Sequence, residues 1–557
     1  MDEIPVLIVG GGPVGLSASI FLSNAGVRSL LLERHPGTSI HPKARGINVR
    51  TMEIYRQHGV EASVRAAGLP PDRARFIIWA RSLAGEELER RIPGRARPEA
   101  QRISPITNCL CAQDDLEPVL RQHAESLAPG TLHFGAEVTA LEQDATGVTA
   151  TVRDAGGERR IRARYAIAAD GAHSRARDAL GIGMTGTAGL YRSINLLLRA
   201  DLTPWVAERP AALYFIEQPG LRGTFLTING RNRWGFLINT LPLDVDVAGY
   251  TRERCADIVR QAAGVPDLDV EILGIAPWTA AAQVAERYRA GRIFLAGDAA
   301  HHMPPTGGFG MNTGVQDVHN LAWKLAAVLQ GWGAPDLLDT YESERLPLGR
   351  AITKQSLANA ASMGRVGPQA VAHAARPTAS ADTRARPEFL SEVGMIFGAA
   401  YASAAVVPDG TPAPAVADPV TQYAPSARPG GRAPHVPLVR DGGAVSTIDL
   451  VGRGFALLTG VDGKAWREAA GPIAAARSIP LTAAAIGPGG DAGDPDGAWA
   501  AAYGVEPDGA VLVRPDGHVG WRRRTRAGDC RAEIAGALDR LLGRGGSALA
   551  AHSAAGG

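Results

Sequence analysis

Short apolar runs that end in glycine or an acidic residue mark the first 300 residues of the chain. Runs at 6–9, 29–32, 165–169 and 292–296 each have the length and apolar character of a buried strand. They are followed by Gly10, Glu33, Asp170 and, after one glycine, Asp298. Open α/β sheets bind ligands beyond the carboxyl ends of their strands, so we expect these four positions to serve one ligand.

The segment 297–314 joins a glycine-rich loop with a Pro-Pro pair to the start of a helix. Apolar residues at 315, 318, 322, 325 and 329 recur with helical spacing, and Thr313 to Gln316 fits a capping box at the helix start. The free N–H groups and positive dipole end of that helix would face whatever the loop contacts. A nucleotide cofactor is one interpretation, and a glycine-rich turn before a core helix is the other.

A second nucleotide motif opens the chain. Gly10, Gly12 and Gly15 form G-x-G-x-x-G directly after the first apolar run, and helical spacing follows. In this motif the glycines permit a tight turn, the approach of a pyrophosphate, and close packing of helix on strand. Glu33, after the second run, could bind the ribose of an adenosine or be an ordinary solvated acid. The motif alone does not separate NAD from FAD.

Asp170 extends the site beyond one mononucleotide. It starts the segment 170–177, which contains a turn and two arginines. The three motifs at 10–15, 170–177 and 297–314 are separated by more than one hundred residues (about one domain length), so we expect a domain interrupted by insertions. A cofactor longer than the adenosine half of NAD would need that spread.

The interval 185–280 has the pattern of an antiparallel sheet. Alternating runs occur at 192–199, 212–216, 223–228 and 234–239. We expect one apolar face of this sheet to cover the cofactor and a substrate. Candidates for lining that space are Trp79, Tyr214, Phe225 and Phe236, although plain core packing is the alternative for each.

Composition narrows the class of protein. The chain has 557 residues, 45% hydrophobic and 20% charged, with a net charge of +2, which favours neither nucleic acid nor an anionic membrane as a partner. The N-terminus carries acids where a signal peptide needs cations, and no apolar run is long enough to span a membrane, so we expect a cytoplasmic protein. The four cysteines, among them Cys109 and Cys111, lack redox or zinc spacing and are expected to be buried thiols. The pair His301 and His302 has no third ligand nearby in sequence, so no metal is expected.

Together the motifs resemble those of the flavin-dependent aromatic hydroxylases, the single-component FAD monooxygenases that include phenol and aromatic polyketide hydroxylases. The likeness rests on the glycine motif with Glu33, on Asp170-Gly-x-x-Ser-x-x-Arg, and on Gly297-Asp298 followed by the segment 304–312. Arg45 and Gln113 extend it, and only the resemblance distinguishes them from surface residues.

The resemblance implies tightly but non-covalently bound FAD. Glu33 would bind the adenosine ribose, Arg45 and Gln113 the phosphates or ribityl chain, and Asp298 the ribityl hydroxyls. The backbone of Met311 and Asn312 would face the N1–C2=O edge of the flavin, where negative charge develops on reduction. The full expected cofactor set is Gly10, Gly12, Pro13, Val14, Gly15, Glu33, Arg34, Arg45, Gln113, Asp170, Gly171, Asp298, Pro305, Gly308, Gly310, Met311 and Asn312.

The chemistry that the resemblance implies is hydroxylation of an aromatic ring. NADPH or NADH, bound transiently, would reduce the flavin, and O2 would form a C4a-hydroperoxide that passes one oxygen atom to a phenolic or polycyclic substrate. The long form of the chain favours a polyketide from antibiotic biosynthesis. The Pro305 carbonyl is the expected contact to the substrate hydroxyl, and Arg222, Tyr214 and His302 are alternative aids to deprotonation.

Other functions stay open at this point. A Baeyer–Villiger or epoxidising oxygenase would use the same scaffold. A pyridine-nucleotide dehydrogenase would leave Asp170 and the segment 297–314 without a role, and a non-catalytic flavin-binding protein would not consume NADPH faster with substrate.

The expected architecture is α/β, with a Rossmann-like FAD-binding domain, an inserted α+β substrate domain on an antiparallel sheet, and a thioredoxin-like C-terminal domain. The last has no Cys-x-x-Cys, so packing or subunit contact is its expected role, in a monomer or homodimer. The expected boundaries are 1–74, 108–182 and 281–350 for the FAD-binding domain, 75–107 and 183–280 for the substrate domain, 351–395 for a helix and connection, 396–543 for the C-terminal domain and 544–557 for a disordered tail.

Overall fold

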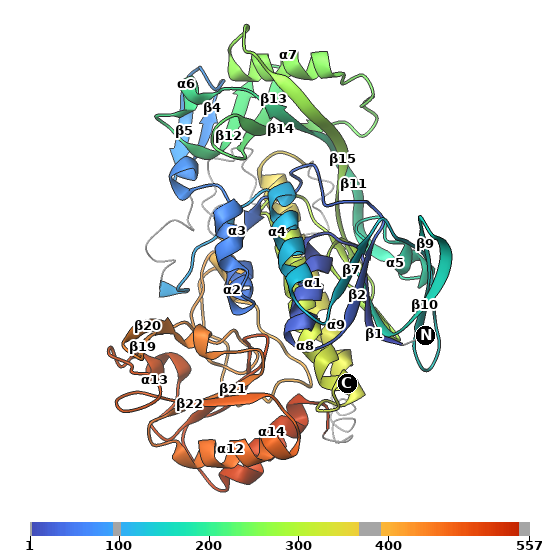
Figure 1. The fold of residues 1–557 in the computed structure, drawn as a ribbon. Helices are drawn as coiled ribbons and strands as arrows, with labels where there is room; N and C mark the ends of the chain where they lie inside the picture. The colour runs from blue at the N-terminus through green and yellow to red at the C-terminus, as the bar shows by residue number, and fades with distance from the viewer. Residues whose placement is uncertain (1–2, 93–101, 367–391, 545–557) are drawn as a thin grey trace, which may run out of the picture.

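The computed structural model describes residues 3–92, 102–366 and 392–544. Two eight-stranded sheets and one four-stranded sheet organise these residues (Figure 1). The first sheet and its helices lie in the middle of Figure 1, the second sheet lies at the top, and the C-terminal domain lies at the lower left. Most of the predicted tail, and parts of the predicted substrate domain and connection, lie outside the described residues.

The first sheet contains the apolar runs that the sequence marks as strands. Its order is β16-β17-β10-β1-β2-β7, with parallel pairing throughout the centre. Parallel strands are buried on both faces, which explains their continuous apolar character. The strands are β1 (Ile4–Val9), β2 (Ser29–Glu33), β7 (Thr131–Phe134), β10 (Gly157–Ala168), β16 (Arg289–Ala290) and β17 (Ile293–Leu295). An antiparallel extension, β8 (Glu137–Gln143) and β9 (Val148–Asp154), was not predicted.

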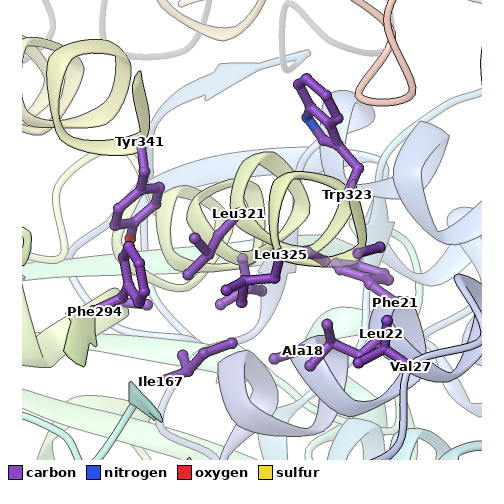
Figure 2. Packing of buried hydrophobic residues seen from close by; sticks show 14 of the residues in the cluster. Ala18, Phe21, Leu22, Val27, Ile167, Phe294, Leu321, Trp323, Leu325 and Tyr341 are labelled. Atoms are coloured by element: carbon purple, nitrogen blue, oxygen red, sulfur yellow. The ribbon is translucent and has the colours of Figure 1, made fainter. Parts of the chain in front are cut away.

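Helices α1 (Pro13–Asn24) and α8 (Gly310–Leu329) form the centre of the core on this sheet. Figure 2 shows Leu321 and Leu325 of α8 above Ala18 and Leu22 of α1, and all four side chains are buried. Each fully buried leucine contributes roughly 1.5–3 kcal/mol through removal of apolar surface from water. The neighbouring helices are α2 (Val49–Gln57), α3 (Glu61–Ala67), α4 (Gln113–Ser126), α5 (Arg175–Ala179) and α9 (Asp339–Ser362).

The second sheet confirms the predicted antiparallel pattern between 185 and 280. Its order is β18-β15-β11-β14-β13-β12-β4-β5, and only β12 with β4 is parallel. Helix α7 (Arg252–Ala263) covers its outer face, above the sheet in Figure 1, and α6 (Thr203–Val206) lies nearby. The strands are β4 (Phe76–Ala80), β5 (Glu87–Arg91), β11 (Met184–Arg199), β12 (Ala211–Gln218), β13 (Leu221–Thr227), β14 (Arg233–Leu241), β15 (Glu271–Ala285) and β18 (His301–His302).

The C-terminal domain is built on a mixed sheet of order β22-β21-β23-β24, in agreement with the predicted thioredoxin-like pattern. Alternate residues of β21 face opposite sides: Phe455 packs toward α8 of the first domain, and Ala456 packs in the cluster with α13. The Phe455 ring lies 5.9 Å from that of Trp323 and 6.4 Å from that of Trp332. The elements are α11 (Val393–Phe397), β19 (Pro437–Arg440), β20 (Gly443–Ser446), β21 (Phe455–Gly460), α12 (Lys464–Ala476), β22 (Leu481–Ile486), α13 (Ala498–Tyr503), β23 (Ala510–Val513), β24 (Val519–Arg523) and α14 (Cys530–Leu541).

All four cysteines are buried free thiols, as predicted. Burial raises the pKa of the Cys111 thiol above its ordinary value, which disfavours the reactive thiolate. Within the described ranges no helix is long and apolar enough to cross a membrane. The same ranges contain no group of three or more His, Cys, Asp or Glu side chains placed to hold a metal ion.

Candidate active site

The glycines of the first motif meet two strict steric limits. Gly10 has a φ of +106°, and a Cβ there would lie 2.3 Å from the Ala169 carbonyl oxygen. A Cβ on Gly15 would lie 1.9 Å from the Gly10 carbonyl oxygen, so only glycine lets α1 approach β1 this closely. Around Gly12 the opposite is true, because a Cβ would meet nothing within 4 Å. Gly12 caps α1 and leaves open space at a helix N-terminus, which suits a phosphate group.

Val14 links the first motif to the third. A Cβ on Gly314 would lie 2.6 Å from the Val14 Cγ2 atom, and one on Gly297 would lie 3.0 Å from it. The start of α1 is therefore in contact with the start of α8 and with the turn at Gly297, although the two glycines lie far along the chain from Val14. The prediction that these motifs converge is confirmed by this contact.

Glu33 lies beside the glycine turn. Its carboxylate accepts hydrogen bonds from the Gly11 N–H at 2.6 Å and the His35 N–H at 2.8 Å. The adjoining Arg34 is exposed. Binding of a ribose by Glu33 stays a prediction, and the structure gives the carboxylate the right position at the end of β2.

The Asp170 carboxylate forms hydrogen bonds within the second motif. One oxygen accepts from the Ser174 hydroxyl at 2.6 Å and the other from the Ala176 N–H at 3.1 Å, so Asp170 shapes the turn into α5. Gly171 has a φ of +85° in that turn. Arg177 donates to the Ala299 carbonyl at 3.3 Å, which joins the second motif to the third.

Asp298 is exposed, whereas its neighbours Gly297 and Ala299 are buried in a single 3-10 turn. Its side chain is therefore available to a ligand at the end of β17. The Gly297 N–H donates to the Asp317 carboxylate at 3.2 Å, which fixes the turn from below.

The predicted start of α8 is wrong. The helix begins at Gly310, and the Thr313 hydroxyl donates to the Phe309 carbonyl at 3.0 Å within the first turn instead of capping a later helix. The first helical bond joins the Thr313 N–H to the Phe309 carbonyl, so the N–H groups of Gly310, Met311 and Asn312 precede the ladder. The loop glycines allow the earlier start, because Gly308 has a φ of +66° and open space around its Cβ position. The expected role of Met311 and Asn312 toward a flavin stays a prediction.

The Asn312 side chain ties this helix start to another loop. Its amide donates to the Gly46 carbonyl at 2.8 Å and to the Gly308 carbonyl at 2.7 Å, and its oxygen accepts from the Asn48 N–H at 2.9 Å. Gly46 lies in β3 (Gly46–Ile47), which pairs with β6 (Cys109–Leu110). The segments around Arg45 and Gln113 are thereby brought to α8.

Arg45 and Gln113 lie side by side along this pairing. The Cys111 N–H donates to the Arg45 carbonyl at 2.9 Å, and the Gln113 side-chain oxygen accepts from the Ala44 N–H at 3.2 Å. The Arg45 guanidinium donates to the carbonyls of Ala212 and Thr227, on strands of the second sheet. Arg45 therefore joins the two sheets, a role that the sequence did not suggest.

A buried ionic cluster beneath the third motif was missed by sequence reasoning. The Asp317 carboxylate lies 2.8 Å from His301 Nε2 and 2.8 Å from Arg345 Nε, and all three side chains are at most 1% exposed. Burial opposes ionisation of Asp317, but Arg345 and His301 lower its pKa below the ordinary value. Arg345 also donates to the Thr313 carbonyl at 3.2 Å. Asp317 does not fall on the stripe formed by 315, 318, 322, 325 and 329, so the apolar pattern carried no signal of its burial.

His302 and Pro305 lie at the loop that continues from β18. His302 is half-buried, and burial lowers its pKa. Its Nε2 atom is buried without a hydrogen-bond partner among the described residues. Pro305 is exposed, and its carbonyl accepts from the Gly308 N–H at 3.1 Å, which leaves one lone pair for a substrate. The buried neighbour Pro304 is held by the Ser356 hydroxyl at 2.6 Å.

Tyr214 is not placed for proton transfer, which corrects the sequence-based expectation. Its ring packs in the cluster under α7, its hydroxyl donates to the Arg209 carbonyl at 2.8 Å, and it accepts from the Ala211 N–H at 2.9 Å. Burial raises the pKa of Tyr214 to about 12. Arg222 is exposed near the β12–β13 turn, opposite Glu217, and its role stays a prediction.

The predicted aromatic lining is also corrected in part. Phe225 and Phe236 pack with Tyr214 under α7, on the outer face of the second sheet. Trp79 lies on the inner face, stacked on Phe215 with ring centroids 5.0 Å apart. Side chains on neighbouring strand positions point to opposite faces, so the sequence fixes two sets of residues but not which set faces the cofactor.

Comparison with known families agrees with this geometry. Residues 3–356 match the FAD binding domain, and residues 426–545 match the aromatic-ring hydroxylase C-terminal domain. The chain therefore belongs to the FAD-dependent aromatic-ring hydroxylases, and it is an FAD monooxygenase. The predicted family, fold class and type of enzyme are confirmed.

Individual relatives match almost end to end. The chain is 38% identical over 578 residues to the tetracenomycin A2 monooxygenase-dioxygenase of Streptomyces glaucescens, covering 98% of this chain and 99% of that protein. It is 40% identical over 556 residues to the 4-methyl-5-nitrocatechol 5-monooxygenase of Burkholderia sp, covering 97% and 98%. A ternary complex of aklavinone-11 hydroxylase with FAD and aklavinone superposes with a TM-score of 0.86 at 36% identity, covering 98% of this chain and 100% of that one.

Proposed function

We propose that the protein uses NAD(P)H and O2 to hydroxylate a polycyclic aromatic compound of the polyketide class. The observation that carries the proposal is the position of the α8 helix start. It lies at the convergence of three nucleotide motifs and is tied by Asn312 to the loop whose Arg45 contacts the second sheet. When FAD is bound, it supplies the redox chemistry and the activation of oxygen.

The residues present fit FAD. Glu33 and Asp298 lie at the carboxyl ends of β2 and β17, with β1 and β10 between these strands, as an extended cofactor requires. Open space at Gly12 suits the pyrophosphate, and the N–H groups at 310–312, which precede the helical ladder, suit the flavin edge. Their hydrogen bonds would stabilise negative charge on that edge without reorganisation. The Pro305 carbonyl would accept a hydrogen bond from a substrate hydroxyl and so increase electron density on the ring.

The inner face of the second sheet suits an aromatic substrate. Leu213, Leu226 and Leu237 on this face are half-buried, whereas the outer-face residues Phe225 and Phe236 of the same strands are fully buried. The inner face therefore retains accessible apolar surface beside the stacked pair of Trp79 and Phe215.

Two connections bring this face next to the loop at 303–309. The loop continues directly from β18, which is part of the same sheet. Helix α9 contacts the loop at Ser356, and Met363, just beyond its end, packs against the cluster of Ile77, Trp79 and Phe215. A separate contact, from the Asn195 amide to the Pro42 carbonyl at 3.2 Å, joins the same face to the segment around Pro42.

The relatives are named for compounds of two kinds, which suggest the first and second candidate substrates. The tetracenomycin and aklavinone enzymes are named for polycyclic compounds, and the nitrocatechol monooxygenase is named for a single ring. A polycyclic substrate is favoured by the breadth of the inner face, which spans six strands between Trp278 on β15 and Trp79 on β4. A simple phenol is the second candidate.

The test is oxidation of NADPH and NADH by the purified holoenzyme with and without phenols and polycyclic hydroxyquinones. We expect an aromatic compound to accelerate oxidation and to gain one oxygen atom from O2, detected by mass. A lactone or epoxide product of the same mass, identified by NMR, would indicate the Baeyer–Villiger or epoxidising alternative. Failure of every aromatic compound to stimulate oxidation or gain oxygen would contradict the proposal.

A matched pair of glycine variants tests the cofactor site separately. Gly12→Ala adds a methyl group that meets no protein atom within 4 Å but occupies the expected pyrophosphate space. Gly471→Ala, in α12 and also without neighbours within 4 Å, is the control. We expect G12A to fold and lose FAD while G471A retains it, as measured by absorbance at the flavin maximum. Equal FAD content in both would contradict the assignment of Gly12.

A further inference from the structure

The inner face of the second sheet carries a small polar group among its leucines. Strand alternation places Ser193 on β11, Thr224 on β13 and Asn239 on β14 on this face. The Asn239 amide donates to the Thr224 hydroxyl at 2.8 Å, so the two side chains form one unit across neighbouring strands. This unit sits where the pairing of β11 with β14 shifts register, and Thr240 has a φ of +59° there. Such irregularities re-aim side chains and are common at functional sites.

Part of the hydrogen-bonding capacity of this group is unused. The Ser193 hydroxyl is buried, with 1% of the residue exposed, and it has no hydrogen-bond partner among the described residues. The same is true of the Asn195 side-chain oxygen on the same strand and face, in a residue 8% exposed. Buried polar atoms in native proteins are almost always paired, so these oxygens call for a partner that the protein itself does not supply, a water molecule or a ligand.

The outer face of the same strands behaves differently. There the Tyr214 hydroxyl has both a hydrogen-bond donor and an acceptor within the protein, and the Thr227 hydroxyl donates to the Ala211 carbonyl at 2.6 Å. One outer-face atom, Trp234 Nε1, is also buried without a partner in the part of the chain that the structure describes. The unpaired oxygens of Ser193 and Asn195, by contrast, lie together on the face that meets the segment around Pro42.

The chemistry of the group selects its ligand. Ser193, Thr224 and Asn239 are neutral. Two cations lie near them: Arg45 is directed at the backbone carbonyls of Ala212 and Thr227, and Arg222, two residues before Thr224 on the same face, is exposed opposite Glu217. A hydroxyl and an amide can both donate to and accept from a neutral oxygen, whereas a carboxylate would call for a cation. Hydroxyl and keto oxygens of a polycycle fit this set.

We propose that Ser193, Thr224 and Asn239 form a subsite that binds hydroxyl or keto oxygens on a ring remote from the oxidised position. This inference rests on the proposed function. Strand β14 lies three strands from β18, where the loop to Pro305 begins, which is roughly 14 Å at the usual strand spacing. One benzene ring does not span that distance, so the subsite distinguishes fused-ring substrates from a simple phenol.

The test compares Asn239→Leu with the control Asn232→Leu. Both residues lie in the β13–β14 hairpin, but Asn232 is exposed in its turn and contacts only Asn229 through its side chain. The probes are 1,8-dihydroxyanthraquinone and phenol, and binding to the oxidised holoenzyme is measured by perturbation of the flavin absorption spectrum. Thr224→Val and Ser193→Ala are smaller changes that test the same subsite if N239L is unstable.

We expect N239L, and to a lesser degree T224V and S193A, to weaken binding of the anthraquinone about five- to tenfold, the effect of one neutral hydrogen bond. Binding of phenol should stay within twofold of wild type, and N232L should change neither ligand. Two results would overturn the subsite but not the proposed function. One is equal affinity of wild type and all three variants for the anthraquinone. The other is an equal loss of affinity for the anthraquinone and for phenol. Absence of any aromatic binding to wild type would overturn the proposed function as well.

Discussion

Replacing Asp317 with asparagine removes one charge from beneath the segment 297–314, the proposed flavin loop, while keeping the shape of the side chain. The Asp317 carboxylate is completely buried, and it accepts hydrogen bonds from Gly297 N–H and Arg345 Nε and contacts His301 Nε2. In D317N the Arg345 guanidinium stays buried beside neutral acceptors: the new amide oxygen and, within the described part of the chain, the Tyr401 hydroxyl and the Thr313 carbonyl, each at 3.2 Å.

The expected cost is about 3–5 kcal/mol of unfolding free energy, because loss of one partner leaves a buried charge uncompensated. The matched control is Asp257→Asn, since Asp257 lies 2.9 Å from Arg260 but its side chain is 75% exposed. Exposed pairs of this kind are screened by water, so D257N should show no measurable change. Urea unfolding of the holoenzymes, followed by the rise in FAD fluorescence on release, measures the transition of the domain that contains the cluster.

The pKa of Asp317 is lowered in the folded protein, which sets the pH dependence of this difference. A lowered folded-state pKa gives a contribution that is complete above the unfolded-state value of about 3.9 and is lost as the pH falls through the folded-state value. The gap between wild type and D317N should therefore be constant near neutrality and close only in acid. Two results would refute the reasoning. One is that D317N loses less than about 1 kcal/mol of unfolding free energy at pH 7, which is the range of an exposed ion pair. The other is that the difference in stability between wild type and D317N disappears between about pH 8 and 6, far above any lowered carboxyl pKa.

Two further outcomes test the C-terminal contact and the corrected role of Tyr214. Burial opposes ionisation of Glu344, but Arg514 and Lys324 lower its pKa to about 2. Wild type should therefore be more stable than E344Q above the unfolded-state pKa of a glutamate, about 4.3. Scanning fluorimetry should show this difference in stability shrinking as the pH falls toward 2. Tyr214→Phe should lower stability by about 1–3 kcal/mol, because the buried Ala211 N–H loses its partner. The same variant should leave kcat and its pH profile unchanged, and a tenfold fall in kcat (about 1.4 kcal/mol) without a stability change would restore Tyr214 as a candidate base.

The Glu344 contact shows how the C-terminal domain is joined to the flavin loop. Arg514 donates to Glu344 at 2.6 Å and 2.8 Å, and Glu344 adjoins Arg345 on α9. These side chains are fully buried, so the interface is part of the enzyme core and not a flexible attachment.

The sequence determined the features that depend on local backbone geometry and on the period of apolar residues. Gly10 and Gly15 are recognisable because no other residue fits the turn and the close helix. The central strands β1, β2, β10 and β17 of the first sheet and β11 to β14 of the second follow from apolar runs and alternation. The family resemblance added Arg45 and Gln113, which no local pattern distinguishes, and the structure places both beside the loop tied to Asn312.

Only the tertiary structure decided which face and which partner each residue has. Alternation divides the second sheet into two sets, and the packing of α7 on Phe225 and Phe236 leaves the other set, with Trp79 and Asn239, toward the flavin loop. The cluster of Asp317, His301 and Arg345 likewise joins residues from three elements, because a buried charge takes its partner from whatever the fold brings near. Contacts of this kind have no period along the chain, so the sequence specifies them only through the completed fold.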